Sequence, residues 1–224
     1  MRKVLIGTPS HDGRLDVWYV NSLVNTIRIA PNFDTHITAV YTSFDSLVQR
    51  ARNSLVTIAM EENYDDIFFI DSDVEWDPQW IFKFLQYPED VVGAALVKKD
   101  DVNEGYTCKI TNQNITYNSR RDLIEVDGIG TGFLKVSRNA FKQLYQSSAP
   151  YKHENKPGVD RMIFDVIIKD DILISEDYTM CNKWKALNDE HKIWMDPTIT
   201  INHIGPKKYQ GNIYNYLKVN KYKL

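Results

Sequence analysis

Apolar runs alternate with segments of helical spacing along the first hundred residues. Four runs predict strands, at Val4–Thr8, Thr35–Thr42, Asp66–Ile70 and Val91–Val97. Between them, apolar residues three and four positions apart predict helices at Leu15–Ile29, at Ser46–Glu62 and from Asp77 to about Tyr87. Strands alternating with helices indicate an α/β fold with a mainly parallel central sheet, Rossmann-like in its first half and flanked by helices.

The pattern becomes irregular after residue 97. From Lys98 to about Asp127 the chain is polar, which favours a loop with a β-hairpin around Gln113–Asn114. Further segments are predicted as a glycine-interrupted strand at Leu123–Val136, a helix at Asn139–Tyr145, a loop at Ser148–Gly158, a helix from Ser175 to about Leu187, a last strand at Lys192–Ile201 and a loop at Asn202–Gly211. We expect one domain over residues 1–224.

Composition narrows the function classes. The chain has 224 residues, a net charge of −3 and 43% hydrophobic residues, which is typical of a globular protein and not of a general nucleic-acid binder. Its apolar runs are too short to span a bilayer. Two cysteines, Cys108 and Cys181, lack metal-type spacing and favour a reducing compartment, so we expect a cytoplasmic protein. Lys207 and Lys208 belong to a basic C-terminal region that is either a solvated tail or a contact for a diphosphate.

Two carboxylates follow the third predicted strand directly. Asp71 and Asp73 flank Ser72 after the buried run Asp66–Ile70. Ligands of open α/β sheets bind outside the carboxyl ends of the strands, and paired carboxylates suit Mg²⁺ or Mn²⁺. Such a cation bridges phosphates and offsets the charge of a leaving nucleoside diphosphate. A solvated acidic turn is the structural alternative.

Three other classes fit the acidic turn less well. Haloacid dehalogenase-type phosphatases carry Asp-x-Asp after the first strand and an Asp pair after a later strand, whereas here Asp170–Asp171 precede one. Nucleotidyltransferases have a glycine-rich basic loop after the first strand, and Thr8–Arg14 contains only Gly13 and Arg14. A carbohydrate-binding module without activity would not need Asp71, Asp73, Glu176 and Asp177 together.

Four ordered motifs resemble GT-A glycosyltransferases of the family-2-like type, small viral or bacterial members in particular. These are Ile67–Trp76, which looks like the metal-binding motif; Gly128–Phe133, which looks like the glycine-rich acceptor segment; Ser175–Cys181, which looks like the Glu-Asp helix start; and Ile193–Pro197 with His203–Gly205, which look like the closing strand and its metal-binding histidine. The resemblance covers nearly the whole chain.

The resemblance implies a role for each motif. The metal ligands are Asp73, His203 and, through water, Asp71, which alternatively touches the donor ribose. Asp177 is the general base of an inverting transfer, with Glu176 as the other candidate. Donor contacts are expected from Thr8, Pro9, Ser10, Arg52, Asn53, Asp71, Ser72, Lys207 and Lys208. The acceptor segment is Gly130, Thr131, Gly132 and Phe133.

Each assignment has a plainer structural reading. Acidic residues complement the dipole of a helix start, Arg52 suits a surface charge, Thr8–Ser10 suits a turn, and Phe133 suits a core position. If the resemblance holds, residues 1–97 bind a UDP-, GDP- or dTDP-sugar with Mn²⁺ or Mg²⁺. Residues 98–224 then bind a glycan, lipid-linked or protein acceptor, with no role for nucleic acid.

Overall fold

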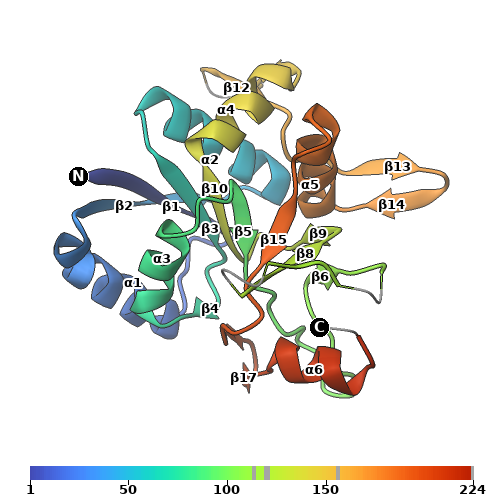
Figure 1. Cartoon of the computed structure of the whole chain (residues 1–224). Helices are drawn as coiled ribbons and strands as arrows, with labels where there is room; N and C mark the ends of the chain where they lie inside the picture. Colours follow the sequence, from blue (N-terminus) through green and yellow to red (C-terminus); the bar gives the residue numbers. More distant parts are fainter. Residues whose placement is uncertain (113–114, 119–121, 155–156, 223–224) are drawn as a thin grey trace.

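The computed structural model describes residues 1–112, 115–118, 122–154 and 157–222, and it is built around an eight-stranded sheet (Figure 1). In spatial order the strands are β2 (Thr35–Ser43), β1 (Arg2–Ser10), β3 (Asp66–Ile70), β10 (Phe133–Ser137), β5 (Val91–Gly93), β15 (Ile193–Met195), β8 (Leu123–Val126) and β7 (Tyr117–Asn118). β2, β1, β3, β5 and β15 run in one direction, and β10 runs against them between β3 and β5. The predicted α/β class with a helix-flanked central sheet is confirmed, but the sheet is mixed and not mainly parallel: three of its seven strand pairings are parallel and four are antiparallel.

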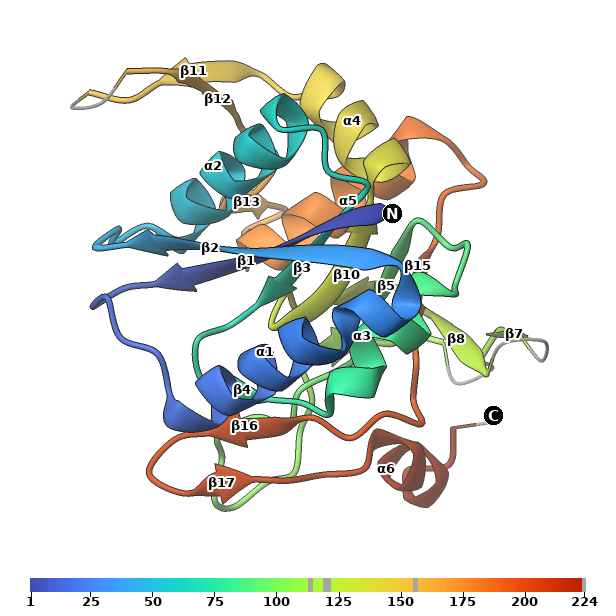
Figure 2. The same ribbon diagram turned by 90° about the vertical axis from the view of Figure 1, so that its left-hand side faces the viewer.

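Helices cover both faces of this sheet. Figure 2 shows α2 (Val48–Glu61), α4 (Arg138–Ser147) and α5 (Glu176–Leu187) on one side, and α1 (Val17–Ile29) and α3 (Pro78–Leu85) on the other. A short 3₁₀ turn, η1 (Ala30–Phe33), follows α1. The helices predicted in these five places are confirmed to within about three residues at each end.

The uninterrupted apolar run of β3 follows from this double cover. Ile67 and Phe69 belong to the core that includes side chains of α2, α4 and α5, whereas Phe68 and Ile70 belong to the core under α1 and α3. Successive residues of a strand point to opposite faces, so Ile67–Ile70, buried on both sides, are all apolar, while Asp66 at the start of β3 is buried as the ion-pair partner of Arg2.

Three predicted strands are too long. Leu123–Val136 is divided into β8, β9 (Gly128–Ile129) and β10. β5 ends at Gly93 and not at Val97, because its neighbours pair no further: Leu134 and Met195 are both opposite Gly93. Val97 makes only an isolated bridge to Tyr106. β15 ends at Met195 and not at Ile201, because Asp196 turns the chain by accepting hydrogen bonds from the Thr198 amide and hydroxyl.

Two segments predicted as loops contain strands. In Ser148–Gly158, β11 (Pro150–Lys152) pairs with β12 (Val159–Arg161). In Asn202–Gly211, β16 (Asn202–Ile204) pairs with β17 (Lys208–Tyr209) and with β4 (Val74–Glu75), which follows the acidic turn. Strands of two or three residues with polar side chains carry no readable periodicity, so the pattern missed them. β6 (Cys108–Lys109) likewise pairs with β9 (Gly128–Ile129), and the expected hairpin at Gln113–Asn114 lies outside the described residues.

Two further elements were not predicted. Helix α6 (Ile213–Val219) follows β17. β13 (Ile167–Lys169) and β14 (Ile172–Ile174) form a hairpin closed by Asp170 and Asp171, whose φ angles are 52° and 61°. Positive φ at both central residues is the mark of a type I′ turn, which matches the twist of hairpin strands.

Candidate active site

A cavity of about 270 Å³ lies beyond the carboxyl ends of β1 and β3. It is lined by Pro9, His11, Asp45, Ser46, Val48, Arg52, Asp71, Ser72, Asp73 and His203. Six of these residues are among those singled out from the sequence: Pro9, Arg52, Asp71, Ser72, Asp73 and His203. The cavity is therefore at the place where open α/β sheets bind ligands.

The acidic turn is held by backbone hydrogen bonds on both sides. The Asp71 amide donates to the Gly132 carbonyl at 3.2 Å, and the Ser72 carbonyl accepts from the Asp16 amide at 3.0 Å. A Cβ at Gly132 would lie 2.3 Å from Leu96 Cδ1 and 3.1 Å from Asp71 Oδ2. A side chain at position 132 would therefore displace the Leu96 side chain and crowd the Asp71 carboxylate.

Arg52 joins this turn to the start of α5. Its Nη2 donates to Asp71 Oδ1 at 3.1 Å, and its Nη1 donates to Glu176 Oε1 at 2.6 Å and to Asp177 Oδ1 at 3.0 Å. The Arg52 side chain is only 5% exposed. A guanidinium in a fixed fork geometry suits this bridging position. Arg52 is therefore not the surface charge of the plainer reading.

Glu176 and Asp177 have divergent acidities. Burial raises the pKa of Asp177 to about 7, with Arg52 opposing the shift and the neighbouring Glu176 adding to it. Burial works in the same direction on Glu176, but the hydrogen bond with Asp177 and the charge of Arg52 lower the pKa of that carboxyl. Asp177 is therefore the weaker acid of the two adjacent carboxyls and takes up a proton at a higher pH than Glu176.

Asp73 faces two nitrogen groups. Lys99 Nζ lies 2.5 Å from Asp73 Oδ2, and His203 Nε2 lies 3.6 Å from Asp73 Oδ1. Burial alone would raise the pKa of Asp73, but hydrogen bonds from His203 and Lys99 outweigh it and keep the pKa below its usual value. Asp73 is therefore a carboxylate that already attracts cationic partners.

His203 is oriented by its other ring nitrogen. Its Nδ1 lies 2.9 Å from the Val97 carbonyl, which can only accept, so Nδ1 carries a hydrogen, and Nε2 faces Asp73. A backbone carbonyl that fixes the tautomer is the usual support of a metal-binding histidine. The Lys99 ammonium marks a cation position on the same carboxylate. Asp73 and His203 offer two ligands to a divalent cation. Among the described residues, however, no three His, Cys, Asp or Glu side chains form a metal-binding group, so Asp71, Asp73 and His203 are not brought together as one ligand set.

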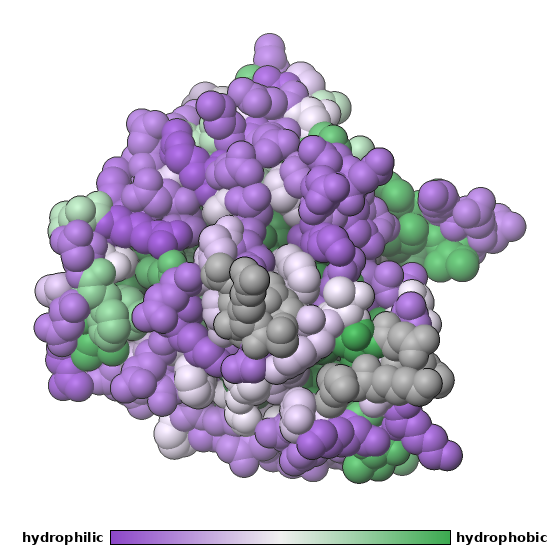
Figure 3. All heavy atoms as spheres, in the orientation of Figure 1, coloured by the Kyte–Doolittle hydropathy of each residue, from purple (hydrophilic) through white to green (hydrophobic). Residues whose placement is uncertain are grey.

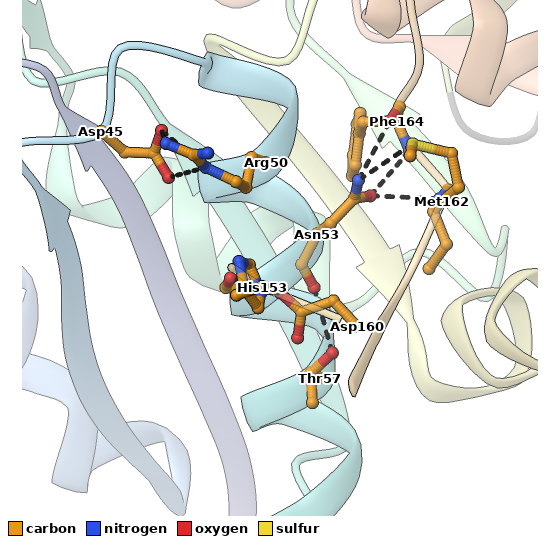
Figure 4. A network of polar contacts seen from close by, with 10 residues as sticks. Asp45, Arg50, Asn53, Thr57, His153, Asp160, Met162 and Phe164 are labelled. Carbon is orange, nitrogen blue, oxygen red and sulfur yellow. Dashed lines mark hydrogen bonds and ion pairs between the residues drawn. The ribbon is translucent and has the colours of Figure 1, made fainter. Parts of the chain in front are cut away.

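Three predicted donor residues are turned away from the cavity. Thr8 is fully buried with its hydroxyl 2.5 Å from that of Tyr19. Ser10 is buried and donates to the Arg14 carbonyl at 2.7 Å. Asn53 accepts from the amides of Ile163 and Phe164 and donates to the Phe164 carbonyl (Figure 4). Their side-chain polar atoms bond inside the protein and none of the three lines the cavity, so their expected donor contacts stay a prediction.

Lys207 and Lys208 also lie outside the cavity lining. Lys207 Nζ lies 2.5 Å from Asp101 Oδ1, and Lys208 Nζ lies 2.6 Å from Glu75 Oε2 and over the Trp18 ring. Each ammonium is paired with a carboxylate, and their contact with a diphosphate stays a prediction.

The residues of the predicted acceptor segment differ in their surroundings. Thr131 is buried, and its hydroxyl lies 3.4 Å from Asp177 Oδ1. Gly130 lies against Thr107, where a Cβ would meet the Thr107 side chain at 2.9 Å. Phe133 is fully buried against the rings of Phe68, Trp76 and Phe84. Phe133 is thus a core residue, and of these residues only Thr131 contacts a predicted catalytic group.

Sequence reasoning missed five residues at the site. His11, Asp45, Ser46 and Val48 line the cavity, and Lys99 contacts Asp73. Asp45 accepts hydrogen bonds from the Arg50 guanidinium (Figure 4). It also accepts one from the Leu47 amide. Their place in the sequence could have indicated them. His11 follows β1 and residues 45–48 follow β2, so they lie at the same edge of the sheet as Asp71.

Comparison with solved structures supports the architecture. A197 from STIV is 17% identical over 94% of this chain and 89% of that chain, with a TM-score of 0.56, so the two share a fold. A glycosyltransferase involved in the glycosylation of the major capsid of PBCV-1 is 14% identical, with 64% and 63% covered and a TM-score of 0.35. TarS of S. aureus is 13% identical, with 87% and 36% covered and a TM-score of 0.41.

The last two similarities are too low to carry an argument about function. No protein-family model matches the chain, and no curated protein matches it in sequence. Among the described residues, none of the helices has the length and apolar character needed to cross a bilayer.

Proposed function

We propose that this protein is a metal-dependent GT-A glycosyltransferase that inverts the anomeric carbon of a nucleotide sugar. The observation that carries the proposal is the Arg52 bridge. It holds Asp71, beside the cavity, within reach of the same guanidinium as Glu176 and Asp177. Asp71 on the donor side and Asp177, the candidate base, are thereby held at fixed positions relative to each other. A displacement in which the acceptor attacks opposite the leaving group requires such positioning.

Asp73 and His203 would hold the divalent cation, with Asp71 on the same turn. The missing ligands would be waters and the phosphates of the donor, since Mg²⁺ usually keeps waters and binds through one or two carboxylates plus phosphate oxygens. When bound, the cation would offset the negative charge that develops on the leaving diphosphate. Pro9, Ser72 and the missed cavity residues His11 and Ser46 are the candidate contacts for the nucleoside.

Asp177 is the proposed base. The acceptor hydroxyl gives its proton to the Asp177 carboxylate while its oxygen bonds to the anomeric carbon and the bond from that carbon to the diphosphate oxygen breaks. A pKa of about 7 suits this task, because general-base catalysis is most effective when the pKa lies near the working pH. Thr131 and Arg52 position the carboxylate from two sides.

A thermal-shift screen of nucleotide sugars with and without Mn²⁺ tests the proposal. The true donor should raise the unfolding temperature only with metal, because a ligand bound by the native state alone stabilises it by mass action. Asp73→Ala should abolish the metal-dependent shift while the protein stays folded. Asp101→Ala, which removes an exposed carboxylate paired with Lys207, is the matched control.

The released product separates the rival chemistries. Glycosyl transfer releases a nucleoside diphosphate, nucleotidyl transfer releases pyrophosphate, and a phosphatase releases inorganic phosphate without an acceptor. Metal-dependent nucleotide binding that persists unchanged in Asp73→Ala would overturn the metal assignment.

A further inference from the structure

The β13–β14 hairpin projects from the molecule beside α5 (Figure 1). It carries three of the most exposed aliphatic side chains of the described residues: Ile168 is 74% exposed, Leu173 69% and Ile172 65%. Figure 3 shows this projection as an apolar patch with a polar tip. Isolated apolar residues on a surface are ordinary, but Ile168 and Leu173 are cross-strand neighbours on one face of a short projecting element, which is typical of an interaction site.

Both edges of the hairpin are open. In the described parts of the chain β13 and β14 pair only with each other, so each offers unpaired backbone groups on its outer side. Ile168 is directly opposite Leu173, and Lys169 opposite Ile172. A lone two-stranded ribbon is marginal in water, and an exposed strand edge is a template for a further strand. The element therefore has the features of a site completed by an added strand.

The hairpin leads directly into the proposed catalytic helix. β14 ends at Ile174, Ser175 is the N-cap of α5, and Glu176 and Asp177 follow. Three residues of chain span at most about 11 Å, and a strand added beside β14 would lie about 5 Å from it. A segment bound along this edge would thus end close to the Asp177 carboxylate.

We propose that β13–β14 is the docking site for a polypeptide acceptor, which adds an extended strand to the hairpin and brings a serine, threonine or tyrosine hydroxyl to Asp177. This inference rests on the proposed glycosyl transfer and specifies its acceptor class. The charges favour a polypeptide over a lipid surface, because the exposed tip residues Asp170 and Asp171 would enter the bilayer first.

A second copy of the chain fits less well at this edge. Hairpin-to-hairpin pairing would place residues 165–174 of the other copy beside Asp177, and that segment contains no serine, threonine or tyrosine. Such a dimer would cover the approach to the base without supplying a hydroxyl. A strand from a separate acceptor would pair with the unpaired backbone groups of the hairpin and would also supply the hydroxyl that glycosyl transfer needs.

The hairpin variant for the test is Ile168→Gln/Leu173→Gln. The control variant, Val24→Gln/Val219→Gln, removes two exposed aliphatic side chains elsewhere: Val24 is 57% exposed and Val219 79%. The probe is an array of synthetic peptides with serine, threonine or tyrosine flanked by randomised residues. We expect the wild type and the control to bind a subset of peptides, and the hairpin variant to bind them at least about tenfold more weakly. The same peptides with alternate backbone amides N-methylated should lose binding to the wild type, since they cannot donate to a strand edge.

Separate measurements keep the two proposals apart. Metal-dependent nucleotide binding by calorimetry should be equal in all three proteins, and its absence from the wild type would refute the proposed function. If nucleotide binding is intact but no peptide binds, or peptides bind the hairpin variant as well as the control, the acceptor inference is overturned. It is overturned equally if the hairpin variant instead loses dimerisation by light scattering or binding to phosphatidylcholine–phosphatidylglycerol vesicles.

Discussion

Asp71 and Asp73 lie two residues apart on one turn, yet their surroundings differ. Asp71 belongs to a cluster around Arg52, whose side chain is 5% exposed and reaches three carboxylates. Asp73 meets Lys99, which is 30% exposed and whose ammonium contacts this one carboxylate. A buried cation with three acidic partners is a fixed part of the structure, whereas a half-exposed lysine with one partner is readily exchanged. Asp71, held by the buried Arg52, is thus suited to positioning the catalytic groups. Asp73, paired with an exchangeable lysine, is suited to binding a cation.

The largest effect expected is on catalysis at the buried cluster. Asp177→Asn keeps the size and some hydrogen bonding of the side chain but cannot take a proton, so kcat should fall by about 10²–10⁴-fold. Metal-dependent nucleotide affinity should stay unchanged, because Asp71, Asp73 and His203 remain. Steady-state kinetics and calorimetry check this pair of results. Glu176→Gln should cost less; the reverse ranking would move the base to Glu176.

Arg52→Met should have the next largest effect, on stability. It leaves three carboxylates without their shared partner, and breaking such a buried network typically costs about 3–5 kcal/mol of unfolding free energy. Arg50→Met, on the same helix, removes the pair with Asp45 of a guanidinium that is 41% exposed, and should cost below about 1 kcal/mol. Urea denaturation of both variants measures the contrast. Equal losses would show that the two clusters do not differ as described.

The buried cluster should also make stability depend on pH. In the folded state the pKa of Asp177 is raised from 3.8 to about 7, so the folded chain holds a proton that the unfolded chain has lost between these values. The unfolding free energy should therefore fall as pH rises from about 4.5 to 7, by at most about 1.4 kcal/mol per pH unit. Urea denaturation across this range should show that the unfolding free energy of Asp177→Asn depends less on pH than that of the wild type. An unchanged slope would mean that other groups cause the pH dependence.

The smallest effect is expected at the exposed cluster. Lys99→Met removes a cation that competes for Asp73, so Mn²⁺ affinity without nucleotide should rise by about two- to fivefold, in keeping with the small energies of exposed ion pairs. Calorimetric titration with Mn²⁺ measures it. Lys98→Met, the neighbouring lysine, is the control and should not change the affinity. A weaker Mn²⁺ affinity in Lys99→Met would mean that the lysine supports the cation site instead of competing for it.

Several features of the site were readable in advance because their causes are local. The apolar run Asp66–Ile70 predicts a strand buried on both faces, and a carboxylate turn at its end predicts a ligand site. Ser175, Glu176 and Asp177 have the composition of a helix start, and α5 begins there. By contrast, Thr8, Ser10 and Asn53 suit a polar site in sequence but use their polar atoms inside the protein.

The sequence by itself thus determined the α/β class, the place of the acidic turn and the helix that carries the candidate base, since periodicity and helix-start signals act over a few residues. Only the tertiary structure decided that Arg52 meets Glu176 across 124 positions, that Lys99 contacts Asp73, and that β10 lies between β3 and β5. These contacts depend on strand order and loop path, which hydrophobic spacing does not specify. The exposure of the β13–β14 hairpin is likewise decided by the tertiary structure, because burial depends on how the sheet and its helices pack together.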